Sequence, residues 1–318
     1  MRVVGLSLVA IFIVNILLDA FVSAKLKNSK GPLYISWNEI MSQSINADLI
    51  VIGNSRASWQ YNTWILDSLL GISSYVLGFD GRGITHAITK YDIYNHFQNR
   101  RPKYLVVNID YTSTLVNLHG SYREQLFPYM ANSFFRKKIL AVEPFNFAEI
   151  YIPVYRYTTY KGLWSLIQIE SRLEDNIYHK GFTPYIQDWN GTEYEKLSTY
   201  HFSPYDQARD ELDLFIAARR EESVNVVLCY APIYIGLTHK VDNLNYVYDC
   251  FNEIAHKHGV PILDYTFSDI SRDMANFANA THLNKQGSEL FTKELCNDLD
   301  SLFSDSSLPA SIAPTNPF

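Results

Sequence analysis

The chain has 318 residues, of which 47% are hydrophobic and 19% charged, so it can bury a large core and lacks the composition of a disordered protein. Its length fits one large domain or two smaller ones. The formal net charge of -6 and the isoelectric point near 5.8 exclude a strongly basic surface, so no nucleic-acid partner is expected. The three cysteines show neither metal-ligand nor disulfide spacing, so no metal site is expected.

The N-terminal segment is apolar. Residues 3–22 read VVGLSLVAIFIVNILLDAFV, a run about as long as a bilayer is thick and interrupted only by Asn15 and Asp19. A signal peptide could be cut after Val22-Ser23-Ala24, which would release a soluble secreted protein, but the run is longer than a signal peptide needs. Basic residues flank both of its ends, so the segment alone does not orient the chain. Residues 1–24 are therefore expected to be an uncleaved membrane anchor, with a signal peptide as the alternative.

Residues 31–303 alternate short β-rich runs with amphipathic stretches. Strands are expected where continuous apolar runs are typical of a parallel sheet buried on both faces, at 47–52, 104–109, 224–230 and 260–264. Helices are expected at about 61–70, 84–98, 204–220, 240–258 and 285–302. This alternation predicts a doubly wound domain with a parallel central sheet, that is, a three-layer α/β/α structure.

Two stretches depart from the alternation. Residues from about 115 to 200 are rich in Tyr, Phe and Pro and show no strand period, so we expect a largely helical insertion that caps the strand ends. The tail, residues 304–318, is rich in Ser and Pro, lacks apolar periodicity and is expected to be disordered.

Two polar loops stand where such a fold places its chemistry. Gly53-Asn54-Ser55-Arg56 follows the first expected strand, and doubly wound sheets bind ligands outside the carboxyl ends of their strands. The loop Asn279-Ala-Thr-His282-Leu-Asn284 precedes the last helix, for which Asn284 is a suitable N-cap. A serine is a poor nucleophile at neutral pH unless a base within about 3 Å takes its proton. The two loops together predict an active site that pairs Ser55 with His282.

These loops resemble the motifs of the SGNH (GDSL-like) hydrolase and acyltransferase superfamily. Gly53-Asn54-Ser55 resembles its Gly-Asp-Ser block, and the run Gly78-Phe-Asp-Gly81-Arg-Gly83 resembles the block that gives a glycine amide to the oxyanion hole. The loop around His282 resembles the Asp-x-x-His-Leu-Asn block before the final helix. The resemblance covers most of residues 47–302 outside the insertion, and looks closest to the membrane-anchored, extracytoplasmic branch of Bacteroidetes. It implies a flavodoxin-like fold.

The resemblance also implies site roles. Ser55 would be the nucleophile and His282 the base and then the acid, while the amides of Ser55 and Gly81 would bind the oxyanion. The family's acid is replaced by Asn279, which can accept the ring N–H but carries no charge; in a serine protease the same change costs about 10⁴ in rate. Asp273 or Asp264 could replace it, or a backbone carbonyl could orient a Ser–His dyad.

The third family block, Gly-x-Asn-Asp, is also altered. The chain reads Val107-Asn108-Ile-Asp110 at this strand end, so neither Asn108 nor Asp110 matches cleanly, and Asn108 is a weak candidate for a further oxyanion donor. Removing one such donor costs about 2.7–4 kcal/mol in enzymes where it was tested.

Four more residues near the serine have open roles. Arg56 and Asp80 are possible substrate contacts, or Arg56 braces the loops by pairing with Asp80 or Asp110, which is the favoured interpretation. Trp59 and Tyr61 could line a sugar site or begin the core face of the first helix.

The resemblance implies a serine-dependent esterase or O-acyltransferase, with acetyl the favoured acyl group, acting on a cell-envelope glycan. The partners would be an acylated glycan or acyl donor and the membrane, the domain would lie outside the cytoplasmic membrane, and no cofactor would be needed. The competing class is a catalytically degenerate protein that binds glycan or assists envelope assembly. A carboxylate beside His282, on the side away from Ser55, would favour the enzyme.

Overall fold

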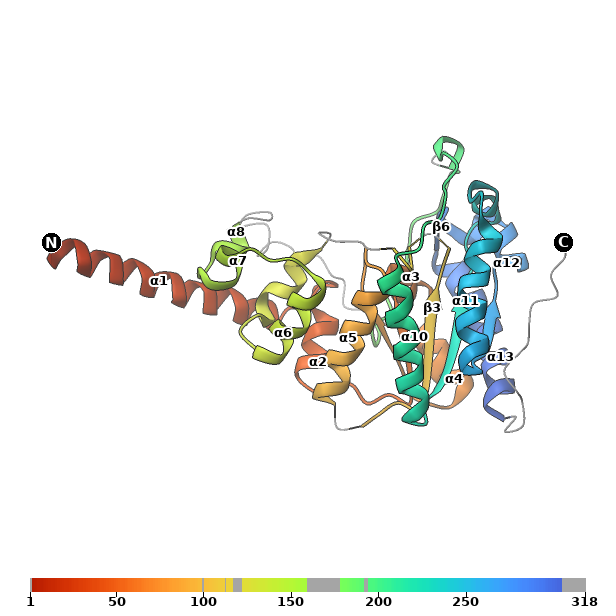
Figure 1. Ribbon diagram of the computed structural model, residues 1–318, viewed down its shortest axis with the longest axis horizontal. Helices are drawn as coiled ribbons and strands as arrows, with labels where there is room; N and C mark the ends of the chain where they lie inside the picture. The colour runs from red at the N-terminus through yellow and green to blue at the C-terminus, as the bar shows by residue number, and fades with distance from the viewer. Residues whose placement is uncertain are drawn as a thin grey trace. The chain divides into compact units, whose positions relative to one another are not determined.

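The computed structural model describes residues 2–98, 100–111, 113–116, 122–158, 178–191 and 194–304 (Figure 1). The chain forms two compact units. The first comprises residues 1–44 and 119–176, and the second comprises residues 45–118 and 177–318. Each unit is therefore assembled from two separate stretches of sequence.

The second unit is built on a five-stranded sheet. Its strands are β1 (Leu49–Gly53), β2 (Ser74–Gly78), β3 (Tyr104–Ile109), β4 (Asn225–Tyr230) and β5 (Ile262–Asp264). They lie in the order β2-β1-β3-β4-β5, and every neighbouring pair is parallel. This is the flavodoxin-like order, whose switch point lies between β1 and β3. The serine loop follows β1 directly, so it stands at that switch point.

Helices of the second unit form two packed groups. One consists of α3 (Ser55–Gln60), α4 (Thr63–Leu70) and α13 (Lys285–Ser304), and the other of α5 (Ile84–Phe97), α10 (Asp206–Glu221) and α11 (Leu244–His258). Figure 1 shows α10 and α11 in front of the strands. Apolar residues of β1, β3 and β4 pack in one core with those of α4 and α13. The expected three-layer α/β/α architecture is confirmed.

Short elements complete the second unit. They are the 3₁₀ helices η3 (Tyr194–Lys196), η4 (Ile235–Lys240) and η5 (Met274–Asn276), the helix α12 (Asp269–Arg272), and the antiparallel pair β6 (Phe277–Asn279) and β7 (His282–Leu283). The pair carries the histidine loop and leads directly into α13.

The first unit is helical in its described residues. Its elements are α1 (Arg2–Lys27), α2 (Ile35–Met41), η1 (Arg123–Tyr129), α6 (Ser133–Val142), α7 (Phe147–Tyr151) and α8 (Tyr155–Thr158). Trp37 of α2 is fully buried, packs edge-on against Phe135 with 5.4 Å between ring centroids, and donates from Nε1 to Gln125 Oε1 at 2.8 Å. The N-terminal segment and the middle of the chain therefore share one core.

Two elements of the second unit differ from the sequence-based expectation. The strand β2 was not expected, because its apolar run is interrupted at its start by Ser74, whose N–H and hydroxyl both bind Asp67 Oδ1 at 2.6 Å, and at its end by Gly78. The helix expected at 61–70 begins at Thr63 as α4, and a separate short helix, α3, precedes it. The two are distinct because Asn62 caps α4 by accepting the N–H of Trp64 at 3.1 Å. The expected strands and remaining helices otherwise agree to within a few residues.

The insertion expected at 115–200 divides between the units. Its described helices, within 122–158, pack with the N-terminal segment, since Tyr157 and Phe127 share a buried cluster with Val22 and Leu26. From residue 177 the chain belongs to the α/β unit again. Apart from Ser304, the last residue of α13, the expected disordered tail lies outside the described residues.

Candidate active site

Ser55 lies where β1 turns directly into α3. The strand is buried along its whole length, and Ser55 is the first residue of the helix. Asn54 stops the strand and starts the helix, because its Oδ1 accepts the N–H of Arg56 at 3.0 Å. The sequence thus presents the serine at the carboxyl edge of the sheet, beside its switch point.

Two glycines allow the close packing around this turn. A Cβ on Gly53 would lie 2.9 Å from the Cβ of Asn108 in β3. A Cβ on Gly78, at the end of β2, would lie 2.0 Å from Ser58 Oγ and 3.0 Å from the carbonyl oxygen of Asn54. Neighbouring strands therefore press on the first turn of α3 and fix the position of Ser55.

His282 reaches Ser55 from the β6–β7 loop. Its Nε2 lies 2.8 Å from Ser55 Oγ, although 227 positions separate the two residues. The loop is held at both ends: Ala280 O accepts the N–H of Tyr234 at 3.0 Å, and Asn284 Oδ1 accepts the N–H of Gly287 at 2.9 Å. The contact has the length that a serine nucleophile and its base require.

The side chain of Asn279 determines which imidazole nitrogen carries the proton. Its Oδ1 accepts the backbone N–H of Thr281 at 3.0 Å and that of His282 at 3.1 Å. Backbone N–H groups only donate, so this atom must be the amide oxygen. His282 Nδ1 lies 3.0 Å from the same oxygen and therefore donates its proton to it. Nε2 is left as an acceptor facing Ser55, which is the tautomer of a general base.

The histidine has no acidic partner among the described residues. Its hydrogen bonds involve Ser55, Asn279 and Thr281, none of which is a carboxylate. Burial, together with the positive charge of Arg56, lowers the pKa of His282 to about 3, and Asp110 opposes this shift only in part. The imidazole is therefore neutral at pH 7 and able to accept a proton, but it is a weak base.

Asp110 connects the serine turn to the end of β3. It is buried and accepts from Asn54 Nδ2 at 2.9 Å and from the Ser113 N–H at 2.6 Å. The buried guanidinium of Arg56 lies 3.7 Å from Asp110, and its Nη2 donates to the carbonyl of Ala231 after β4. The Arg56 contacts therefore brace three strand ends, as the favoured interpretation of the sequence had it.

Three donors are candidates for the oxyanion hole. The N–H groups of Ser55 and Gly81 donate to none of the described residues, and Gly81 has φ 68°, a conformation that glycine adopts without strain. Asn108 uses its Oδ1 to accept the Tyr61 hydroxyl at 2.9 Å, while its Nδ2 is buried with no described partner. A buried unpaired donor costs about 1–3 kcal/mol, so Asn108 remains a candidate for the further donor.

Two aromatic rings lie beside His282. The Trp59 ring centroid is 4.7 Å from that of His282, and Tyr185 packs edge-on against Trp59 at 4.5 Å. The position of Tyr185 is fixed because its carbonyl accepts the N–H of Lys285 at 2.8 Å. Sequence reasoning missed Tyr185, since it stands among many aromatic residues of the expected insertion and no local spacing links it to the histidine loop.

The remaining candidates have structural contacts. Asp80 accepts the Ser58 hydroxyl at 2.8 Å, and burial raises the pKa of Asp80. Asp264 and Asp273 each accept a backbone N–H of their own loop and do not contact His282, so neither replaces the missing acid. Tyr61 is fully buried in the core, which excludes it from a sugar site.

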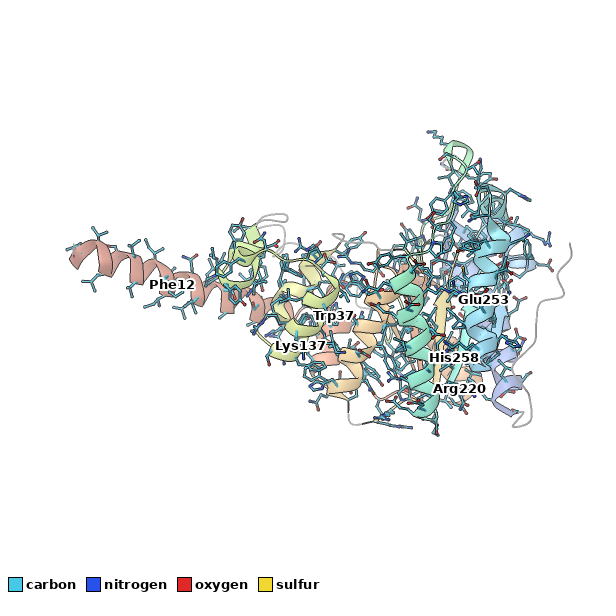
Figure 2. All side chains as sticks on the ribbon, viewed as in Figure 1. Phe12, Trp37, Lys137, Arg220, Glu253 and His258 are labelled. Atoms are coloured by element: carbon cyan, nitrogen blue, oxygen red, sulfur yellow. The ribbon has the colours of Figure 1, made fainter. Side chains whose placement is uncertain are left out.

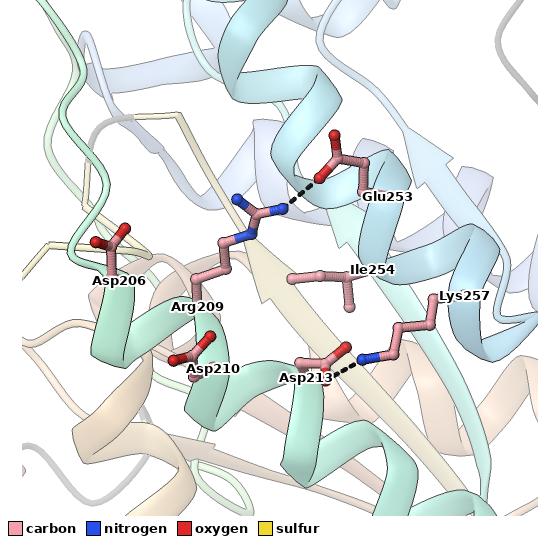
Figure 3. Close-up of a pocket in the computed structure, with 7 residues that line it drawn as sticks. All are labelled: Asp206, Arg209, Asp210, Asp213, Glu253, Ile254 and Lys257. Carbon is pink, nitrogen blue, oxygen red and sulfur yellow. Dashed lines mark hydrogen bonds and ion pairs between the residues drawn. The ribbon is translucent and has the colours of Figure 1, made fainter.

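No other chemical cluster stands out in the described part of the chain. No group of three His, Cys, Asp or Glu side chains that could hold a metal ion occurs among these residues. Figure 3 shows a pocket of about 460 Å³ between α10 and α11. Its charged residues pair with one another, Arg209 with Glu253 and Lys257 with Asp213, so we interpret it as a solvated ion-pair surface.

Comparisons with known proteins give few matches. No family model and no curated protein matches the chain. Among solved structures, a protein from Desulfitobacterium hafniense DCB-2, described as a candidate lipolytic protein of the G-D-S-L family, is 9% identical with a TM-score of 0.42. The match covers 79% of this chain and 99% of that chain. The interpretation of the site rests on the hydrogen bonds and burial described above.

Proposed function

We propose that the protein is a serine-dependent ester hydrolase or O-acyltransferase. The observation that supports this best is the 2.8 Å contact between Ser55 Oγ and His282 Nε2, with Nδ1 bound to the Asn279 carbonyl. A histidine held in this tautomer by a fixed acceptor is what the base of a nucleophilic serine requires, and a chance surface contact would not fix both nitrogens.

The reaction would proceed through an acyl-serine. Ser55 Oγ attacks the ester carbonyl carbon while His282 Nε2 takes the hydroxyl proton, and the resulting oxyanion accepts from the amides of Ser55 and Gly81. The intermediate collapses as His282 returns the proton to the departing alcohol oxygen. Water or a sugar hydroxyl then attacks the acyl-serine with His282 again as base, and the bond between the acyl carbon and Ser55 Oγ breaks as His282 returns the proton to that oxygen, giving hydrolysis or transfer respectively.

The proposed substrate is a cell-envelope glycan, acylated where the reaction is hydrolysis and the acceptor of a group from a separate acyl donor where it is transfer, with acetyl as the acyl group. Trp59 and Tyr185 are half-buried, so their rings can present apolar faces to a sugar beside the histidine. The N-terminal helix Val3–Lys27 is long and apolar enough to cross a membrane, and in this proposal it holds the α/β unit on the extracytoplasmic side. The resemblance to membrane-anchored SGNH proteins supports the same assignment.

A non-catalytic glycan-binding or assembly role is the second candidate. Two observations favour it: Asn279 stands in the acid position, and the pKa of His282 is lowered to about 3. A base this weak removes the serine proton slowly.

Labelling of Ser55 separates the two candidates. Full-length protein in detergent is treated with a fluorophosphonate and, in parallel, with a chromogenic acetyl ester. We expect wild type to be labelled, Ser55→Ala to be unlabelled, and His282→Ala to react about 10²–10⁴ times more slowly, the usual contribution of a general base. Ser301→Ala, on an exposed face of α13, is the matched control and should behave as wild type. A folded wild type that neither labels nor hydrolyses the ester would favour the binding role.

A further inference from the structure

The N-terminal helix has an exposed part and a packed part. Side chains from Val3 to Leu18 are exposed apart from the half-buried Asn15, and Figure 2 shows Phe12 projecting away from the helix. The last turns differ, since Val22 and Leu26 are each only 2% exposed and pack with Phe127 and Tyr157. The helix is therefore apolar and unpartnered along its first part, and is a core element of the first unit along its last.

Polar contacts tie the packed part of the helix to α8. The Ser23 hydroxyl lies 2.6 Å from the Tyr157 hydroxyl, in a buried position. Asp19 accepts from Arg156 Nη2 at 2.5 Å and from the Val154 N–H at 2.9 Å. Val154 has φ 67°, a costly conformation for a β-branched residue, and the Asp19 contact helps to hold it. Cleavage after Ala24 would remove Asp19 and Ser23 together with these contacts.

An apolar patch lies beside the point where the helix emerges. It consists of Phe147, Tyr151, Ile152 and Tyr155, which we call the collar and which are 73%, 62%, 48% and 39% exposed. The rings of Phe147 and Tyr151 contact each other, with 4.8 Å between centroids. Figure 1 shows α7 and α8 alongside α1. Because the Val154 N–H binds Asp19, the collar lies at the level where the exposed apolar part of the helix ends.

We propose that the collar inserts into the interfacial layer of a lipid bilayer that the retained helix α1 crosses. The helix from Val3 to Phe21 spans about 28 Å at about 1.5 Å per residue, close to the hydrocarbon thickness of a bilayer. Asp19 then lies in the last turn of this span, at the edge of the hydrocarbon, and its charge is neutralised by Arg156, as a carboxylate near lipid requires. Aromatic side chains concentrate at this depth, where their rings are apolar and their hydroxyls meet water. Lys25 and Lys27, exposed just beyond, lie at headgroup level.

The retained helix is tested by mass. Full-length protein is purified from the membrane fraction, and its intact mass and N-terminal sequence are determined. We expect a chain that still contains residues 3–24. A mature protein beginning at Lys25 would overturn the proposal, because Asp19 and the apolar helix would be absent from it.

The depth of the collar is tested with an environment-sensitive thiol label. The described cysteines, Cys229, Cys250 and Cys296, are all buried, so a label reports a single introduced site. The variants Phe147→Cys and Tyr151→Cys are labelled with NBD and reconstituted in phosphatidylcholine–phosphatidylglycerol vesicles containing brominated lipid. Ala20→Cys on the helix is the positive control, and Leu214→Cys, an exposed apolar site on α10, is the matched negative control.

We expect the extent of quenching of the labels at residues 147 and 151 to be within about twofold of that at residue 20, with blue-shifted emission. The label at residue 214 should stay unquenched. Collar labels that behave like the label at residue 214 would overturn the proposal. Neither test depends on the chemistry at Ser55, so failure here and failure of the proposed function are distinguishable.

Discussion

The turn that carries Ser55 and the loop that carries His282 are held by different kinds of interaction. Around the serine, a buried carboxylate and a buried guanidinium, Asp110 and Arg56, connect the ends of three strands. Around the histidine, the contacts are neutral: an asparagine carbonyl and a threonine hydroxyl bind Nδ1. The turn that carries Ser55 is therefore held by charged side chains, whereas no charged side chain binds His282.

This difference means that one set of contacts determines the position of Ser55 and another determines how strong a base His282 is. The charged network fixes where Ser55 stands but does not touch its hydroxyl, and the neutral loop fixes the tautomer of His282 but leaves its pKa low. A change on the serine side should therefore act mainly on folding, and a change on the histidine side mainly on rate.

The largest effect is expected from Asp110→Ala. It leaves the Arg56 guanidinium buried without its carboxylate and deprives Asn54 and Ser113 of an acceptor. Breaking a buried ion pair from one side costs about 3–5 kcal/mol, so the free energy of unfolding should fall by that amount in urea titrations. Fluorophosphonate labelling should fall with the folded fraction.

Glu253→Ala is the control for this change. Glu253 pairs with Arg209 across the surface in Figure 3, where the glutamate side chain is 65% exposed. Exposed pairs contribute about 0–1 kcal/mol, so this variant should stay near wild type. If the free energy of unfolding falls equally in the two variants, the contacts of Asp110 stabilise the serine turn no more than an exposed ion pair would.

The second effect is a gain, expected from Asn279→Asp. The aspartate keeps an oxygen opposite His282 Nδ1 and adds the charge that stabilises the imidazolium. Because the wild-type amide already fixes the correct tautomer, the gain should be smaller than the loss of about 10⁴ seen where the tautomer is wrong; we expect kcat to rise about 10- to 100-fold. Steady-state hydrolysis of the acetyl ester measures this.

The pH profile distinguishes this gain from a structural one. Wild type should keep a flat rate between pH 5 and 8, since the lowered pKa leaves His282 neutral there. In Asn279→Asp the pKa of His282 rises, so an acidic limb should move into the measured range. Asn279→Ala, which removes the acceptor, should lose rate without gaining that limb. An unchanged profile in the aspartate variant would show that the loop does not control the base.

The same contrast explains what the sequence could predict. Ser55 and His282 each follow a local pattern, a polar turn after a buried strand and a loop before the last helix; both were predicted as site residues, and the structure places them 2.8 Å apart. The sequence offered Asp80 and Asp110 as alternative partners of Arg56, and the pairing with Asp110 depends on how the loops after β1 and β3 pack, which no local spacing encodes. Tyr185 and the division of the chain into two units are likewise long-range, because the contacts that decide them join segments far apart in sequence.

The smallest effect expected is a loss of stability at mildly acidic pH. The unfolded chain binds a proton at His282 near pH 6.5, while the folded chain binds it only near pH 3, so between these values the unfolded state holds more protons. Stability is therefore present above about pH 6.5 and is lost as the pH falls, by about 1–2 kcal/mol at pH 5. Urea unfolding of wild type and His282→Gln at pH 7 and pH 5 measures the difference, and the other titrating groups cancel because both chains share them. If His282→Gln loses as much stability between pH 7 and pH 5 as wild type does, the His282 imidazole is solvated in the folded protein. Its pKa is then not lowered, and His282 is not the weak base described above.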